Sequence, residues 1–415
     1  ELCYRQINFQ MVMMETRKNL KIFMRHFRSN NYDEKLKYYF NYANLCKVPK
    51  DVSRETHKFL SLYNHGSNTT KKVDQYFESA RSHVSSVFGG TAEKWFFSGP
   101  VSQAVTYAAL HIIKDFMLKN NKKPEFVTYK NNFPSLILPI QNMSKLSLCV
   151  FNLVDYPENG IDQEWLELNV KGKDVFLLSL VDFFNGQIHD LDLIYEFCNK
   201  ENILLMVDFS QFPFWGKLNV SKYKNTVFFT VLHKWLFGYP GSSLAYIPFD
   251  TLPVIQSWRN KKDLFNLDEN SNIINTYEVS NRNPISVSSF EGSFKFVKGI
   301  GIDKLNKLLE NSMSYLLENI SQIETSLYKN NNSGENNFHL FSYDSRYMNL
   351  KSNILLIKTD MVDELYKHLK QNGFAITSYK NIGIRLSTSF VTAKEEVDSL
   401  TSSIKNFFQN SIYNK

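Results

Sequence analysis

The stretch TVLHKWLFGYPGSSLAYIP, residues 230–248, places a histidine and a lysine between two apolar runs. Both runs predict β-strands, and the Gly-Tyr-Pro-Gly segment between them predicts a tight return of the chain. Lys234 therefore lies where two buried segments converge. An amine among apolar neighbours has a lowered pKa and becomes a usable nucleophile, although a lysine directly after a strand is most often a surface residue.

Apolar runs alternate with amphipathic segments from about residue 90 to about residue 250. Runs such as EFVTY and DVFLLSLV predict strands, and segments such as VSQAVTYAALHIIKDF predict the helices between them. This alternation predicts an α/β domain with a mostly parallel sheet and helices on both faces. Ligands bind such sheets at the carboxyl ends of the strands, so the polar residues after each run are the candidates for chemistry.

The chain of 415 residues is long enough for two domains. Beyond about residue 250 the pattern changes to long helical segments and short strands, which predicts a smaller α+β domain. We expect three parts: an N-terminal segment over residues 1–44 that packs with the small domain, a large α/β domain over 45–275, and the small domain over 276–415.

Composition limits the classes of function. The net charge of +7 comes from basic residues scattered along the chain, which argues against nucleic-acid binding and mildly favours anionic ligands. No apolar run approaches the roughly 20 residues of a membrane span. The four cysteines, Cys3, Cys46, Cys149 and Cys198, match neither a zinc site nor a disulfide framework, so we expect a cytoplasmic protein.

Polar groups after three of the apolar runs describe one chemistry. Asp208 ends the run ILLMVD, and a buried carboxylate needs a cation or a donor beside it. Lys234 follows a later strand, and the turn SGPVS opens a helix whose N-terminus suits a phosphate. A carboxylate for a pyridinium nitrogen, an amine for an imine and a helix start for phosphate together indicate a pyridoxal 5′-phosphate site. Each feature alone is common in proteins without such a site.

The order of these features resembles class V aminotransferases, a group of fold type I pyridoxal-phosphate enzymes that includes cysteine desulfurases, isopenicillin-N-epimerase-like enzymes and kynureninases. VDFSQF resembles the group's D-x-x-Q segment, LHKWLFGYPGSSLAYI its lysine segment, and KNIGIRLSTSFVTAKEEVDSL its arginine segment. These matches run from about residue 39 to about residue 408. The resemblance implies a large, mostly parallel seven-stranded sheet domain and a smaller α+β C-terminal domain.

The resemblance also implies roles for individual residues. Lys234 forms the internal aldimine and then carries the substrate α-proton, and Asp208 pairs with the pyridine nitrogen. Gln211 hydrogen-bonds the phenolic oxygen of the ring. Phe133 stacks on the ring, unless it is simply a core residue.

The expected phosphate contacts depart from the family pattern. The resemblance implies a phosphate turn formed by Gly99, Ser102 and Gln103. Many members add a hydroxyl two or three residues before the lysine, where this chain has two aliphatic residues. We expect Thr230, one step further away, to contact the phosphate instead.

Residues from elsewhere in the chain are expected to bind the substrate. Arg385 holds the substrate α-carboxylate through a bidentate pair, unless it forms a surface salt bridge. Asn41 and Ala43 line the substrate side. The segment YEVSNRNPIS resembles a loop that reaches the neighbouring subunit, so Ser280 and Asn281 imply a homodimer with shared sites.

The reaction is predicted only by class. The family's S-H-x-x-N-x-x-G is SLVDFFNG here, with Phe183 in place of the asparagine, so no particular substrate can be carried over. Residues 199–415 contain no cysteine, which disfavours a desulfurase. His233 either acts as an acid or base or packs beside Lys234. We expect a pyridoxal-phosphate enzyme that acts on a small amino acid by aminotransferase-like or lyase-type chemistry; the alternative is an inactive relative that serves as a binding partner.

Overall fold

The computed structural model describes residues 37–64, 70–157, 160–249, 254, 277–278, 283–330, 338–341 and 352–413. Contacts within the chain divide these residues into two compact units. The larger unit comprises the described residues of 52–292 and residue 352, and the smaller unit comprises those of 37–51, 293–341 and 353–413.

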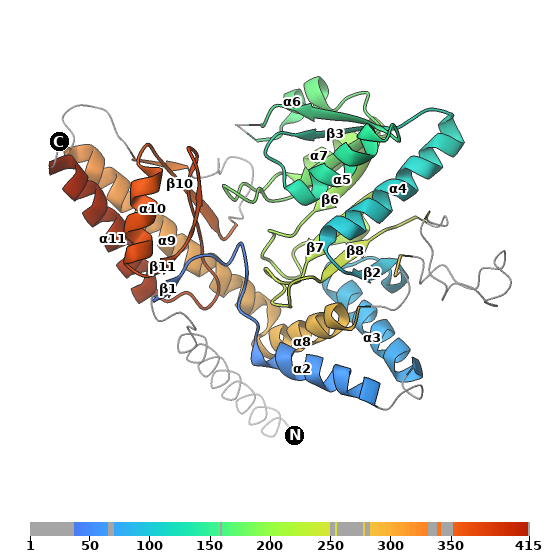
Figure 1. The fold of residues 1–415 in the computed structure, drawn as a ribbon, viewed down its shortest axis with the longest axis horizontal. Helices are drawn as coiled ribbons and strands as arrows, with labels where there is room; N and C mark the ends of the chain where they lie inside the picture. The colour runs from blue at the N-terminus through green and yellow to red at the C-terminus, as the bar shows by residue number, and fades with distance from the viewer. Residues whose placement is uncertain are drawn as a thin grey trace, which may run out of the picture. The chain divides into compact units, whose positions relative to one another are not determined.

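A seven-stranded sheet forms the centre of the larger unit, with the order β2-β8-β7-β6-β5-β3-β4 (Figure 1). Its strands are β2 (Trp95–Ser98), β3 (Glu125–Tyr129), β4 (Val150–Val154), β5 (Val175–Ser179), β6 (Leu204–Asp208), β7 (Thr226–Val231) and β8 (Ser243–Tyr246). Strand β8 pairs antiparallel with β7 and β2, whereas the other neighbouring strands of this sheet pair parallel. The predicted mostly parallel sheet is therefore confirmed.

Helices cover both faces of this sheet. They are α3 (Thr70–Phe88), α4 (Val101–Asn120), α5 (Pro134–Lys145), α6 (Gln163–Asn169) and α7 (Leu191–Lys200), with 3₁₀ turns at Ala92–Lys94 and Val220–Lys222. Val105 of α4 and Ile140 of α5 pack with Leu177 of β5 in one apolar cluster. Trp165 of α6 contacts the ring of Phe176, which points to the opposite face because side chains alternate along a strand.

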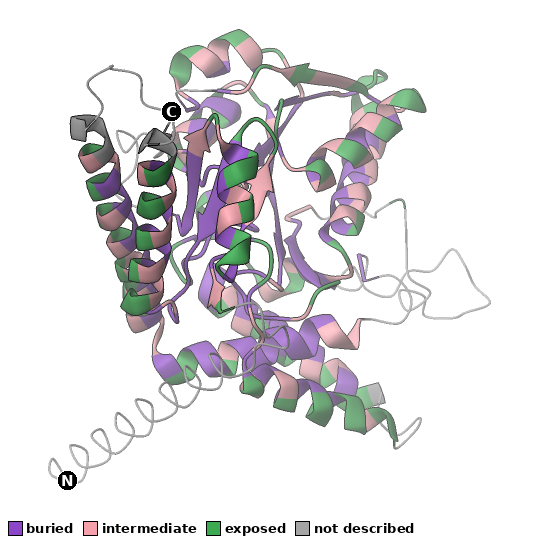
Figure 2. Ribbon diagram, turned by 60° about the vertical axis from the view of Figure 1, so that its left-hand side comes forward, coloured by how far each residue is buried: buried purple, intermediate pink, exposed green. Residues whose placement is uncertain are grey.

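Burial on both faces explains the continuous apolar runs of the sequence. All five residues of β5 are buried, as is typical of a central parallel strand. Figure 2 shows the strands mainly in the purple of buried residues, whereas the helices also carry the green of exposed ones.

The smaller unit is an α+β structure, as predicted. An antiparallel sheet has the order β12-β13-β10-β9, and β1 pairs parallel with β11. The strands are β1 (Tyr38–Tyr39), β9 (Phe338–Phe341), β10 (Ile354–Thr359), β11 (Phe374–Ala375), β12 (Thr377–Tyr379) and β13 (Gly383–Ser387), and the helices are α9 (Ile302–Asn330), α10 (Val362–Gln371) and α11 (Lys394–Tyr413). Leu316, Leu355, Leu365 and Leu400 join these helices and strands in one apolar core.

Two further helices include residues of both units, α2 (Lys50–Ser61) and α8 (Pro284–Ile300). Gly301, with φ of 93°, separates α8 from α9, since a left-handed backbone ends a helix. Each helix of the described residues is too short or too polar to cross a lipid bilayer.

Candidate functional site

A small pocket lies at the carboxyl ends of three neighbouring strands of the larger unit. It is lined by Phe133, Ser179, Val181, Phe183, Asp208, Ser210, Gln211 and Lys234. Ser179 and Asp208 end β5 and β6 and lie opposite each other in the parallel register, and Lys234 follows β7. Four residues predicted to contact the cofactor, Phe133, Asp208, Gln211 and Lys234, therefore lie around one pocket.

A tight return of the chain presents Lys234 to this pocket, where it is only 6% exposed. The amide of Leu232 donates to the carbonyl of Ser242 at 3.0 Å, and the amide of Gly238 donates to the carbonyl of Leu232 at 2.7 Å. A Cβ at Gly238 would lie 2.8 Å from the Cβ of Leu232 and 3.0 Å from that of Ser289. The glycine is therefore needed for this close approach.

Phe133 forms one wall of the pocket, with its ring centroid 4.9 Å from Nζ of Lys234. Its backbone amide donates to Oδ1 of Asn132 at 2.7 Å, and the Ser179 hydroxyl donates to the same oxygen at 2.5 Å. The ring also meets the ring of Phe183 edge-on at 5.3 Å. These contacts fix Phe133 against the end of β5.

Asp208 is buried, and burial raises the pKa of its carboxyl group. Hydrogen bonds from Ser210 and the charge of Lys234 act in the opposite direction. The Ser210 amide donates to Oδ1 of Asp208 at 2.8 Å, and the Ser210 hydroxyl accepts from the Val231 amide at 3.1 Å. Ser210 thus joins the carboxylate to β7, a role that the sequence pattern does not reveal.

Trp235 orients the side chain of Gln211. The indole N–H of Trp235 donates to Oε1 of Gln211 at 3.0 Å, and the indole N–H of Trp215 donates to the carbonyl of Trp235 at 3.0 Å. Because an indole N–H can only donate, it fixes which end of the amide is oxygen. The NH₂ end of Gln211 is therefore directed away from Trp235.

The predicted phosphate residues do not line this pocket. Gly99, Ser102 and Gln103 lie at the start of α4, directly after β2. A Cβ at Gly99 would lie 2.7 Å from Oε1 of Gln103. Thr230 lies within β7, where its buried hydroxyl donates to the carbonyl of Val231 at 3.3 Å. Their phosphate contacts remain predictions.

Arg385 and Asn41, both predicted substrate residues, lie together in the smaller unit. Nη2 of the buried Arg385 donates to Oδ1 of Asn41 at 3.4 Å and to the hydroxyl of Thr377 at 3.5 Å. Burial lowers the pKa of the guanidinium group. Ala43 is also buried, and Asn281 lies outside the described residues.

The profile of the family Aminotransferase class-V matches residues 38–400. The chain belongs to the class V aminotransferase family. The predicted family is therefore confirmed, and with it the predicted cofactor, since enzymes of this family use pyridoxal phosphate. This class V protein is a pyridoxal-phosphate-dependent transferase or lyase.

Solved structures share the fold of this class V chain. The apo cysteine desulfurase of Thermococcus onnurineus NA1 is 16% identical, with a TM-score of 0.75 over 90% of this chain and 95% of that one. The cysteine desulfurase CsdA of Escherichia coli is 15% identical, with a TM-score of 0.71 over 93% and 98%. The cystine C-S lyase C-DES, in complex with its product cysteine persulfide, is 14% identical, with a TM-score of 0.70 over 88% and 97%. The curated proteins contain no match.

His233, directly before Lys234, is expected to make the stability of this class V protein fall as the pH falls. Burial and then the charge of Lys234 lower the pKa of His233 from 6.5 to about 4, so the folded chain binds fewer protons than the unfolded chain between these values. The contribution of His233 to the free energy of unfolding is therefore fully present above pH 6.5 and is lost as the pH falls toward 4. In a His233→Asn variant, the melting temperature should fall less between pH 7 and pH 5 than in wild type.

The exposed His57→Asn variant controls for the general effect of losing a histidine. An unchanged loss of melting temperature in His233→Asn would show that His233 does not contribute to the pH dependence.

Proposed function

We propose that this class V enzyme binds pyridoxal phosphate covalently through Lys234 and acts on the amino group of a small amino acid. The observation that carries the proposal is a single pocket lined by an amine, a carboxylate and an aromatic ring, those of Lys234, Asp208 and Phe133. All three are at the carboxyl edge of the parallel sheet, where α/β proteins bind their ligands.

The groups around the pocket fit the cofactor. The cofactor's aldehyde requires an amine, its ring nitrogen a carboxylate, and its ring face an apolar or aromatic surface. Lys234, Asp208 and Phe133 provide these three groups, and Gln211 adds an amide whose oxygen accepts from the indole N–H of Trp235. The start of α4 does not line this pocket, but it has backbone N–H groups of the kind that bind phosphate, and we propose it for the phosphate group.

When bound, pyridoxal phosphate supplies an aldehyde and an electron-withdrawing ring that stabilises negative charge at the substrate α-carbon. Lys234 would hold the cofactor through its aldehyde carbon, and the amine of Lys234 would serve as the proton acceptor for the substrate α-carbon. Asp208 would favour a protonated ring nitrogen, because a buried carboxylate is stabilised by a cation beside it. Ser210 keeps the carboxylate in place, and Phe133 excludes water from one side.

We assign the substrate carboxylate to Arg385. A guanidinium group offers two parallel N–H donors that match a carboxylate. The hydrogen bonds from Arg385 to the uncharged side chains of Asn41 and Thr377 orient its guanidinium group. Ala43 and Asn281 belong to the same proposed substrate side.

The proposed reaction is amino transfer or a C–S or C–C lyase reaction. Phe183, in the position of the family's asparagine, lines the pocket and replaces a polar contact by an apolar ring. At Phe183, the substrate or the cofactor would therefore make an apolar contact in place of a hydrogen bond. We also propose a homodimer with shared sites, and a cytoplasmic location. Cys46, Cys149 and Cys198 are buried and form no disulfide among the described residues, which supports a reducing compartment.

The proposal is tested with full-length protein loaded with pyridoxal phosphate and a panel of L-amino acids, with the visible spectrum and the released products recorded. Pyridoxamine phosphate and a keto acid indicate amino transfer, whereas release of a β-substituent indicates a lyase. With the best substrate, Arg385→Lys should raise KM by about 10- to 100-fold, because one bidentate, charge-assisted pair is lost.

The exposed Arg54→Lys variant is the matched control and should keep the wild-type KM. If Arg385→Lys also keeps it, Arg385 does not bind the substrate carboxylate. If no amino acid changes the spectrum, the proposed substrate class is wrong.

A further inference from the structure

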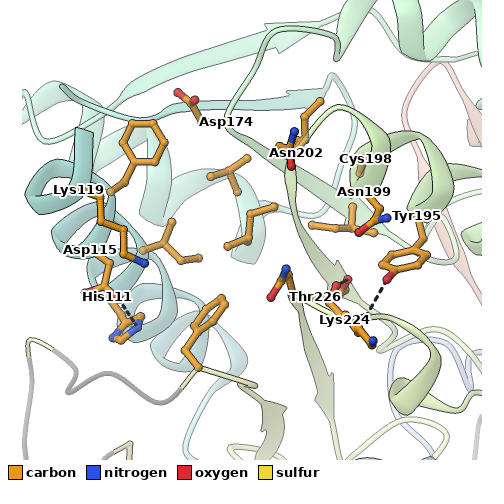
Figure 3. Close-up of a pocket in the computed structure, with 18 of the residues that line it drawn as sticks. His111, Asp115, Lys119, Asp174, Tyr195, Cys198, Asn199, Asn202, Lys224 and Thr226 are labelled. Atoms are coloured by element: carbon orange, nitrogen blue, oxygen red, sulfur yellow. Dashed lines mark hydrogen bonds and ion pairs between the residues drawn. The ribbon is translucent and has the colours of Figure 1, made fainter. Parts of the chain in front are cut away.

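A second, larger cavity of about 370 Å³ lies at the opposite edge of the large sheet. Its lining includes Val175, Leu204 and Thr226, which begin β5, β6 and β7. The same three strands end at the proposed cofactor pocket. Figure 3 shows the cavity between α4, which carries His111 and Lys119, and α7, which carries Tyr195 and Asn199.

The interior of this cavity is apolar and partly aromatic. Ile112, Val175 and Leu205 line it with buried side chains. The ring of Phe249 stacks on the ring of His111, with 5.4 Å between centroids and 7° between planes. A volume of this size is typical of small-molecule sites, and the lining combines these apolar side chains with polar ones such as Asn120, Asn202 and Thr226.

The two acidic residues of the lining are already engaged by cations or donors. One carboxylate oxygen of Asp115 lies 3.2 Å from Nζ of Lys114. Its other oxygen lies 3.3 Å from Nε2 of His111 (Figure 3). Oδ2 of Asp174 accepts from the Glu125 amide at 2.8 Å, and its other oxygen lies 3.5 Å from Nζ of Lys122. These acids therefore add little negative charge to the cavity.

The lysines of the lining are different. Lys119, on α4, and Lys224, before β7, make no salt bridge within the part of the chain that the structure describes. The nearby His111 is uncharged at neutral pH, because burial lowers its pKa to about 4. Among the described residues that line the cavity, the charge that is not balanced by a salt bridge is thus positive.

We propose that this cavity is a second small-molecule site, which binds an organic anion with an apolar body. The apolar part contacts the buried floor and the stacked rings, and the anionic group lies between Lys119 and Lys224. Apolar burial supplies most of the affinity, and the lysines select against neutral and cationic ligands.

Such a ligand and the cofactor can be bound at once. The two sites lie at opposite ends of strands of five or six residues, which separates them by roughly 17 Å at about 3.3 Å per residue. Occupation of this cavity should therefore leave the visible spectrum of the bound cofactor in place.

The test uses full-length protein loaded with pyridoxal phosphate and the fluorescent anion 1-anilinonaphthalene-8-sulfonate. Lys119→Gln combined with Lys224→Gln should weaken its binding about tenfold, since each exposed charge contributes a few-fold. The double variant Lys145→Gln, Lys217→Gln, with two exposed lysines outside the cavity, should bind like wild type. Asn199 is an exposed lining residue on α7, and an Asn199→Trp variant should weaken probe binding because the larger, uncharged side chain occupies part of the cavity.

Competition defines the ligand class. 4-Phenylbutyrate should displace the probe at least tenfold better than its neutral amide, and inorganic phosphate should displace it poorly. Equal competition by the amide, equally good competition by inorganic phosphate, or unchanged probe affinity in both cavity variants would overturn the proposal. The visible spectrum of the cofactor is recorded in the same cuvette. An unchanged spectrum indicates that the probe binds at this cavity, whereas a changed spectrum indicates that it binds at the cofactor pocket.

Discussion

A Lys234→Ala variant is expected to lose the covalently bound cofactor and about a thousandfold or more of its turnover. Lys234 carries the one amine among the described residues that line the cofactor pocket, and its removal takes away both the attachment and the proton acceptor. The measurement is the visible absorbance of the purified protein together with the rate on its best amino acid. The fold should persist, because alanine shortens a side chain at the edge of a pocket.

The matched control is Lys222→Ala, an exposed lysine of the same unit, which should keep both colour and rate. A Lys234→Ala protein that stays coloured and retains the wild-type rate would show that another residue holds the cofactor.

Asp208→Asn is expected to lower turnover by about 10²- to 10³-fold, the loss typical of a preorganised electrostatic contact. Asparagine has the same shape as aspartate but no charge, so it cannot stabilise a proton on the ring nitrogen. Burial of Asp208 makes the loss larger, because a charge interacts more strongly with its partner where water is excluded. Turnover and cofactor affinity are both measured.

Asp155→Asn is the matched control, since this carboxylate is 88% exposed and pairs with Lys130 at the surface. It should leave turnover unchanged. If Asp208→Asn also turns over at the wild-type rate, the carboxylate does not act on the cofactor ring.

The predictable part of the fold and site follows from the parallel sheet. Strands buried on both faces are continuous apolar runs, which the sequence shows directly in β5 and β6. Parallel strands also end at one edge, so Asp208 and Lys234, far apart in the chain, could be expected near one ligand. Phe133 and Gln211 followed from resemblance to the family, and both line the pocket.

Contacts between side chains could not be predicted in this way. The hydrogen bond from Trp235 to Gln211 joins residues 24 positions apart and depends on the rotamers of both. Ser210 contacts Val231 only because β6 and β7 pair side by side. The cavity around His111 lies at the amino edge of the sheet, where no general rule places a ligand.

Borohydride reduction of the cofactor-loaded protein, followed by peptide mass mapping, tests the central claim most directly. Reduction converts the bond between lysine and cofactor into a stable secondary amine, so the attachment residue keeps the added mass. We predict that the phosphopyridoxyl group is on Lys234, in the peptide that contains VLHKWLFGYPG. Modification of a different lysine, or a Lys234 peptide that remains unmodified in coloured protein, would contradict the account.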